Sequence, residues 1–272
     1  MTLSYAINID NNNDIFYHKN LKLMQSDAWQ FLQNYTPARI ARGRAGHSIP
    51  TSELLKFQVD HAQARDAVYS ELDTQQLNES IIETLDLQIL NLKSEINNRS
   101  QYLQRPDLGR TLSQTSRENL KSISCSESDI CFVIADGLSA EAVNQNALSV
   151  LENLIPKLRA IHWKIAPICI VEQGRVAIAD EIGFLLKSEI VVILIGERPG
   201  LTSPNSMGAY ITFHPHVGMT DESRNCVSNI RPEGLNIQMA TDKILYLLTE
   251  IRTKKLSGVG LKDESEEKTL IN

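Results

Sequence analysis

Three glycine-containing segments place polar side chains where strands are expected to end. They are residues 135–139, 174–176 and 196–200, which read ADGLS, GRV and GERPG. In an open parallel sheet, ligands bind outside the carboxyl ends of the strands, where the connecting loops open on one edge. If the three segments follow neighbouring parallel strands, they meet at that edge, and we expect a ligand site there.

The first segment is expected to lead from a strand into a helix that Ser139 caps. Backbone N–H groups at such a helix start can bind a phosphate. The segment matches neither GxGxxG nor GxxxxGK[ST], so dinucleotide or triphosphate binding has little support. A tight turn, in which Gly137 supplies a permissive backbone, explains the same residues. Both interpretations stay open.

Glu197 follows the most apolar run of the chain, EIVVILIG. A carboxylate at the end of a buried strand must be paired or solvated. Arg198 points the other way along an extended chain, so it is not the obvious partner. Glu197 could accept hydrogen bonds from the amides or hydroxyls of a ligand. Alternatively, N–H groups of its own GERPG loop satisfy it, and the residues alone favour this second interpretation.

Other combinations of reactive side chains are incomplete. Asp60 and His61 lack the GxSxG context of a hydrolase triad. His214 and His216 could bind a metal from one strand face, but no third ligand is evident. Cys226 has no partner cysteine and no basic motif beside it, which favours a packing role. These residues therefore predict neither a catalytic group nor a metal site in this chain.

The overall composition narrows the class of protein. The chain has 272 residues, 42% of them hydrophobic, which is enough for the core of one large domain or two small ones. The formal net charge of -6 argues against a protein that grips phosphate backbones, so no nucleic-acid partner is expected. The basic run 39–44 is short and is expected to make a subunit contact or an intramolecular tie.

Neither a membrane span nor a disulfide framework is expected. No apolar stretch reaches the roughly 18 residues that a membrane helix needs. The N-terminal sequence MTLSYAINIDNNND lacks the basic and apolar regions of a secretory signal. The cysteines lie far apart without a CxxC, which predicts reduced thiols, a cytoplasmic location and no zinc site. They are Cys125, Cys131, Cys169 and Cys226.

Strands and helices are expected to alternate in the second half of the chain, which predicts an α/β class with a parallel sheet covered on both faces. The expected strands lie at 129–137, 164–171, 189–200 and, more weakly, 210–213, and the expected helices begin at 139 or span 179–186 and 236–252.

The first half of the chain is expected to be helical without a sheet strand. Helices are expected after Pro50, at 81–97 and at 116–123. The expected organisation is a loose arm (1–35), a helical N-terminal region for subunit contacts (36–125), the sheet domain (126–260) and a polar tail (261–272).

A series of segments in fixed order resembles the small subunits of ethanolamine ammonia-lyase. The resemblance runs from about residue 36 to residue 260. The segments are TPARIARGRAG, DHAQARDAV, LKSEINNRSQYLQRPDLGR, FVIADGLSAEAV, GRVAIADEIG, VVILIGERPG and RNCVSNIRPEG.

The resemblance implies a Rossmann-like domain that closes over adenosylcobalamin, in an enzyme that converts ethanolamine into acetaldehyde and ammonia. It places cofactor contacts of this subunit on Val176, Glu197 and Cys226, each in an intact motif. It also implies a large-subunit partner in an assembly of six large and six small chains, within a bacterial microcompartment. Between Glu197 and Cys226 the chain is one residue shorter than the family pattern, so the path of that loop can differ.

Two other functions remain compatible with the residues alone. One is a stand-alone nucleotide-binding α/β enzyme, against which the missing glycine-rich phosphate motif counts. The other is a non-catalytic interaction module that binds a partner protein but no corrinoid. A nucleotide titration tests the nucleotide-binding enzyme. Corrinoid binding by a complex with the partner distinguishes the interaction module from the small subunit that the resemblance implies.

Overall fold

The computed structural model describes residues 24–25, 27–123 and 126–262. The chain divides into two compact units, Met1–Ala62 and Gln63–Asn272. Residues 1–23 of the expected arm, Cys125 and residues 263–272 of the expected tail lie outside the described residues. No helix of the described part is long and apolar enough to cross a membrane.

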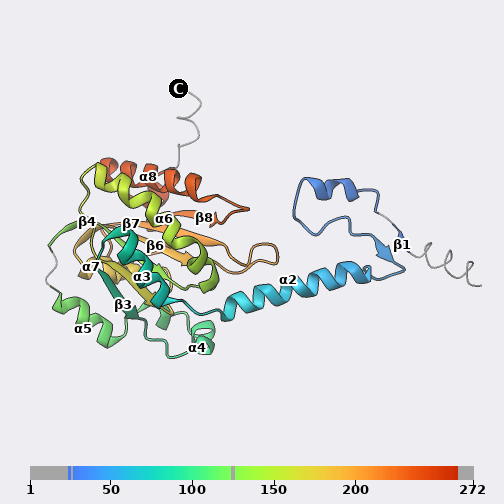
Figure 1. The fold of residues 1–272 in the computed structure, drawn as a ribbon, viewed down its shortest axis with the longest axis horizontal. Coiled ribbons are helices and arrows are strands. Elements are labelled where there is room, and N and C mark those ends of the chain that lie inside the picture. The colour runs from blue at the N-terminus through green and yellow to red at the C-terminus, as the bar shows by residue number, and fades with distance from the viewer. Residues whose placement is uncertain (1–23, 26, 124–125, 263–272) are drawn as a thin grey trace, which may run out of the picture. The chain divides into compact units, whose positions relative to one another are not determined.

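The second unit is built on a six-stranded sheet with the order β3-β5-β4-β6-β7-β8 (Figure 1). Its first four strands are parallel, while β7 and β8 run antiparallel to their neighbours. The strands are β3 (Ile89–Lys93), β4 (Ser128–Ala135), β5 (Ile168–Glu172), β6 (Ser188–Gly196), β7 (Met207–Phe213) and β8 (Arg224–Ile230). The expected α/β class is therefore confirmed.

Helices cover both faces of this sheet. Side chains of α3 (Thr74–Leu85), α6 (Ala140–Ala160) and α8 (Ile237–Lys254) build the core on one face. On the other face, α5 (Gln114–Ser122) and α7 (Ile178–Leu185) cover β4, β5 and β6. Figure 1 shows α6 and α8 side by side over the first face. The strand β4 is buried on both sides, which explains why it reads as an unbroken apolar run.

The sequence predicts a parallel sheet, but two of the six strands, β7 and β8, run antiparallel to their neighbours. The connection from β6 to β7 spans only residues 197–206 and contains no helix. A connection this short cannot return the chain to the start of the sheet for a parallel strand, so β7 runs back beside β6. The segment RNCVSNI, for which no strand was expected, then forms the edge strand β8.

The expected helix at 81–97 is wrong. The helix α3 ends at Leu85, because Asp86 adopts a left-handed backbone conformation with φ of 49°. The chain continues as β3, which pairs in parallel with β5 from Ile89↔Ile168 to Lys93↔Glu172. The apolar spacing of this stretch fits a helix as well as a strand, and the free edge of β5 decides between them. The first half of the chain thus supplies one strand, β3, to the six-stranded sheet.

Short elements connect the longer ones in this unit. The segment between β3 and α5 contains α4 (Arg99–Gln104) and the 3-10 turn η2 (Leu108–Arg110). The 3-10 turn η3 (Asp221–Ser223) directly precedes β8, and η4 (Gly258–Gly260) follows α8.

The first unit contains the pair of short strands β1 (Met24–Gln25) and β2 (Arg44–Ala45), the 3-10 helix η1 (Gln30–Asn34) and the start of α2 (Thr51–Tyr69). Within it, Arg39 pairs with Asp60 and Arg42 pairs with Glu53. The basic run 39–44 therefore makes intramolecular ties to α2, one of the two roles expected for it.

Candidate functional site

The three glycine-containing loops meet at the carboxyl ends of β4, β5 and β6, as expected. The N–H of Leu138 donates to the carbonyl oxygen of Gly196 at 2.9 Å, which joins the first loop to the third. The N–H of Gly174 donates to Asp136 Oδ1 at 3.0 Å, which joins the second loop to the first. Gly137 has a left-handed φ of 57°, and a Cβ there would lie 2.2 Å from the carbonyl oxygen of Gly196.

The first loop forms a tight turn, and protein groups accept hydrogen bonds from several N–H groups of this turn and of the start of α6. Besides the bond from Leu138, the N–H of Ala142 donates to Ser139 Oγ at 3.2 Å, and that of Glu141 donates to Ser70 Oγ at 2.9 Å. Ser139 is thus the N-cap of α6, as expected. Three N–H groups at this turn and helix start thus already donate to protein acceptors, which favours the tight turn over a phosphate cradle.

Glu197 is half-buried, and its carboxylate accepts three hydrogen bonds from the neighbouring strands. Oε2 accepts from Ser206 Oγ at 2.5 Å and from the N–H of Asn229 at 3.2 Å, and Oε1 accepts from Ser228 Oγ. These donors lie outside the GERPG loop, so the expectation that the loop itself satisfies the carboxylate is wrong. A carboxylate offers about four acceptor positions, so Oε1 retains capacity for a further donor.

Cys226 lies beside Glu197 on the same face of the sheet. It is the cross-strand partner of Tyr210, whose hydroxyl hydrogen-bonds its thiol. Although the residue is exposed at the surface, packing around the sulfur hinders solvation of a thiolate and raises the pKa of Cys226. The nearby charge of Glu197 raises that pKa further, and the bond from Tyr210 opposes the shift. At neutral pH the thiol is therefore protonated.

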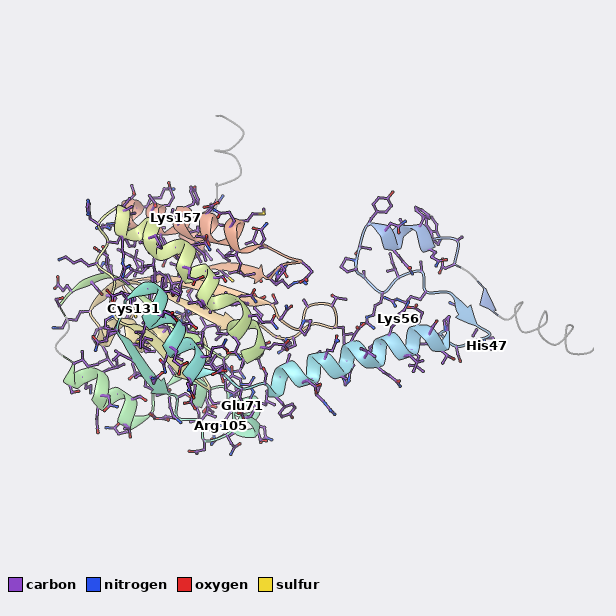
Figure 2. All side chains as sticks on the ribbon, viewed as in Figure 1. His47, Lys56, Glu71, Arg105, Cys131 and Lys157 are labelled. Atoms are coloured by element: carbon purple, nitrogen blue, oxygen red, sulfur yellow. The ribbon has the colours of Figure 1, made fainter. Side chains whose placement is uncertain are left out.

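The expected packing role for Cys226 does not fit this exposure. Cys131 and Cys169 are the cysteines that pack in the core, and Figure 2 labels Cys131 within the sheet. Cys131 and Cys226 are free thiols, in agreement with the expectation of reduced thiols.

Val176 lies just before α7 and is half-buried. It packs against the same core cluster as Tyr210, on the face of the sheet that α7 covers and that carries Cys226. The three residues that the family resemblance singled out thus lie on one face of one sheet. Glu197 and Cys226 are neighbours there, and Val176 comes from a separate loop.

A buried ionic cluster that no sequence motif predicted lies behind these loops. Asp136 is buried, and its Oδ2 lies 3.4 Å from Arg99 Nη1. Burial raises the pKa of Asp136 to about 6, although Arg99 and the N–H groups of the second loop oppose the shift. The ring of Tyr102 lies between two guanidinium groups, 4.5 Å from that of Arg99 and 4.1 Å from that of Arg175. Tyr102 lies in YLQRPDLGR, one of the motifs that carry the family resemblance.

The histidine pair lies at the opposite, amino-terminal edge of the sheet. His214 and His216 line a hollow of about 670 Å³ together with Ser128 and Ser188, where β4 and β6 begin. His216 Nδ1 lies 3.0 Å from the backbone oxygen of His214. No group of three or more potential metal-ligating side chains occurs among the described residues.

Comparisons with known proteins show the family to which the chain belongs. The family model of the ethanolamine ammonia-lyase light chain matches residues 26–262. The chain is 52% identical to the ethanolamine ammonia-lyase small subunit of Azotobacter vinelandii over 88% of this chain and 89% of the relative. It is 50% identical to that of Pseudomonas putida over 89% and 90%, and 48% identical to that of Xanthomonas campestris over 90% and 90%. The chain therefore belongs to the ethanolamine ammonia-lyase light chain family.

Proposed function

We propose that this chain is the small subunit of an adenosylcobalamin-dependent ethanolamine ammonia-lyase, a carbon–nitrogen lyase that converts ethanolamine into acetaldehyde and ammonia. The relatives carry the name of small subunits of this enzyme. The observation that carries the assignment of a site is the group of Glu197, Tyr210 and Cys226 on one face of the sheet, in which Cys226 is exposed and the other two residues are half-buried. We propose that this face forms one wall of the cobalamin site.

The chemistry of these side chains fits the cofactor. The rim of cobalamin carries neutral amides and one phosphate, so a strongly basic pocket is not required. Glu197 Oε1 can accept a further hydrogen bond from an amide, Val176 offers apolar contact and Cys226 offers a compact neutral thiol. When bound, adenosylcobalamin supplies an organic radical through homolysis of its cobalt–carbon bond.

The part of this chain in the reaction is to hold the cofactor and to exclude water from it. The internal bonds from Ser206, Ser228 and Asn229 keep the Glu197 carboxylate in one orientation. We assign no catalytic group to this subunit. Ethanolamine is cationic and needs carboxylates around it, and we expect the large subunit to supply them.

The first unit is proposed to contact the large subunit. Large apolar side chains are exposed there, with exposed fractions of 63% for Trp29, 54% for Phe31 and 82% for Tyr35. Exposed aromatic side chains of this kind are typical of subunit interfaces. We propose an assembly of six large and six small chains, located within a bacterial microcompartment.

Co-expression with a candidate large subunit tests the proposal. The two chains should co-purify, bind adenosylcobalamin with a change in its absorption spectrum, and release ammonia from ethanolamine. The small chain alone should release none. Co-purification without corrinoid binding would instead identify an interaction module. Saturable nucleotide binding by this chain alone, without a large subunit, would favour a nucleotide-dependent enzyme.

A further inference from the structure

The loop that carries Val176 is held by a segment far away in the sequence. Its backbone is strained, because Gln173 is not a glycine and has a left-handed φ of 57°. A loop in this conformation keeps it only when surrounding contacts determine it. Two such contacts come from Ser94, directly after β3, and from Gly109 in η2. Ser94 Oγ donates to the carbonyl oxygen of Gln173 at 2.8 Å, and the N–H of Arg175 donates to the carbonyl oxygen of Gly109 at 2.8 Å.

Tyr102 on α4 makes the most buried of these contacts. Its side chain has no exposed surface, and its hydroxyl donates to the carbonyl oxygen of Gly174 at 3.0 Å. The guanidinium groups of Arg99 and Arg175 lie over its ring. Arg175 also donates from Nη2 to the carbonyl oxygen of Tyr102 at 3.1 Å. Burial raises the pKa of Tyr102, so the hydroxyl stays a donor at every working pH.

The fit between the two segments leaves no spare room. A Cβ at Gly109 would lie 2.8 Å from Arg175 Cγ and 3.2 Å from the carbonyl oxygen of Gln173. On the other side of the loop, the N–H of Gly174 is held by Asp136. Gly174 is therefore fixed through both its N–H and its carbonyl oxygen, two residues before Val176.

We infer that Tyr102 is a positioning residue for the cofactor: through Gly174 it holds the loop at the place where Val176 meets adenosylcobalamin. This inference rests on the proposed function. Tyr102 itself is covered by protein and touches no ligand. Its effect on the cofactor passes through the backbone of residues 173–176, which distinguishes it from Glu197 and Cys226.

Tyr102→Phe in the complex with the large subunit tests the inference. The variant keeps the ring between the two guanidinium groups and loses only the bond to Gly174. The dissociation constant of adenosylcobalamin should rise about fivefold, the effect of one buried neutral hydrogen bond. The rate of ammonia release at saturating cofactor should stay within about twofold of wild type. Tyr69→Phe is the matched control, because Tyr69 is exposed, and it should leave the constant unchanged.

A double-mutant cycle separates positioning from general stability. If Tyr102 acts through Val176, the combined loss in Tyr102→Phe with Val176→Ala should be smaller than the product of the two single losses. Should Tyr102→Phe fail to assemble, Arg175→Lys loosens the same loop by losing the planar stack on Tyr102, and it should show the same pattern.

The outcomes are distinct. A wild-type complex that binds no adenosylcobalamin removes the proposed function and this inference together. A wild-type complex that binds it, with an unchanged constant in the variant or with fully multiplicative losses in the cycle, overturns the inference alone. A lower melting temperature with unchanged cofactor affinity also overturns it, because it shows a purely structural role.

Discussion

At the scale of single residues, the carboxylate of Glu197 accepts hydrogen bonds from its own chain and is proposed to accept one more from the cofactor. Three donors of β7 and β8 or their flanks already bind it, and Oε1 keeps room for another. Gly208 supports this arrangement, since a Cβ there would lie 3.0 Å from Glu197 Oε1. The orientation of the carboxylate is therefore set before a cofactor binds, so less side-chain conformational entropy is lost on binding.

Glu197→Gln should weaken adenosylcobalamin binding to the reconstituted complex by about tenfold. Glutamine loses the charge and turns an NH₂ donor toward the donors of the cofactor, and a charge-assisted bond contributes about 1.5–3 kcal/mol. Glu83→Gln is the matched control, because it makes the same change at an exposed carboxylate of α3, which covers the other face of the sheet. It should change the dissociation constant by less than about twofold. An unaltered constant in Glu197→Gln would remove this residue from the site.

Asp136 should make stability depend on pH. The folded chain raises its pKa from 3.8 to about 6, so the folded state keeps the proton to a higher pH than the unfolded state. The stability that protonated Asp136 contributes is present in full below about pH 4 and is lost as the pH rises through about 6. Asp136→Asn does not titrate and keeps an acceptor for the N–H of Gly174.

Urea unfolding of both forms between pH 4 and pH 7 measures this effect. The unfolding free energy of the wild type, relative to that of Asp136→Asn, should fall by about 2 kcal/mol over this range, because each pKa unit of difference contributes about 1.4 kcal/mol and part of the change lies below pH 4. Other carboxylates titrate equally in both forms and cancel. A difference that stays flat, or that grows with pH, would contradict the raised pKa.

At the scale of elements, the contact between the first and third loops depends on two glycines, Gly137 in the first loop and Gly196 in the third. Gly137→Ala should prevent stable folding, because its Cβ would lie 2.2 Å from the carbonyl oxygen of Gly196, a backbone atom that cannot move aside. Gly218→Ala is the matched control. Its φ of 97° is also unfavourable for alanine, but no atom lies within 4 Å of the added Cβ.

The melting temperatures and soluble yields of the two variants measure the contrast. Gly218→Ala should cost only the backbone strain, about 1–2 kcal/mol. Gly137→Ala should lose several times as much or fail to accumulate as folded protein. Equal losses in the two variants would show that the close approach of the loops is not required.

At the scale of the whole molecule, the boundary between the two units determines which residues can be deleted or replaced, as a test of subunit contacts, without disturbing the sheet. Residues 74–122 pack with the sheet and include β3, so a deletion that reaches residue 122 removes a strand as well as an interface. The exposed aromatic residues of the first unit can be replaced without touching the sheet.

Trp29→Ala combined with Tyr35→Ala should weaken association with the large subunit by tenfold or more, since a few large aromatic residues carry most of the binding free energy at interfaces, each about 1–2 kcal/mol or more. Val259→Ala is the control, because Val259 is 80% exposed but lies in the second unit. A titration of the large subunit followed by size-exclusion chromatography measures the effect. Equal affinity in the double variant and the wild type would place the interface elsewhere.

The amino-acid sequence by itself determined the α/β class, the strands β4 and β6 and the meeting of three loops at one edge. Buried parallel strands are apolar on both faces, so their sequences predict them without information about the neighbouring strands. The motifs also identified the family, which the comparisons confirm.

Only the tertiary structure decided the state of residues 89–93, the donors of Glu197 and the place of Tyr102. The apolar spacing of β3 suits either a helix or a strand, and pairing with β5 selects the strand. Glu197 meets Ser228, and Tyr102 meets Gly174, across more than 30 and more than 70 residues of chain. Such contacts follow from how the strands are ordered in the sheet, and local propensity carries no information about that order.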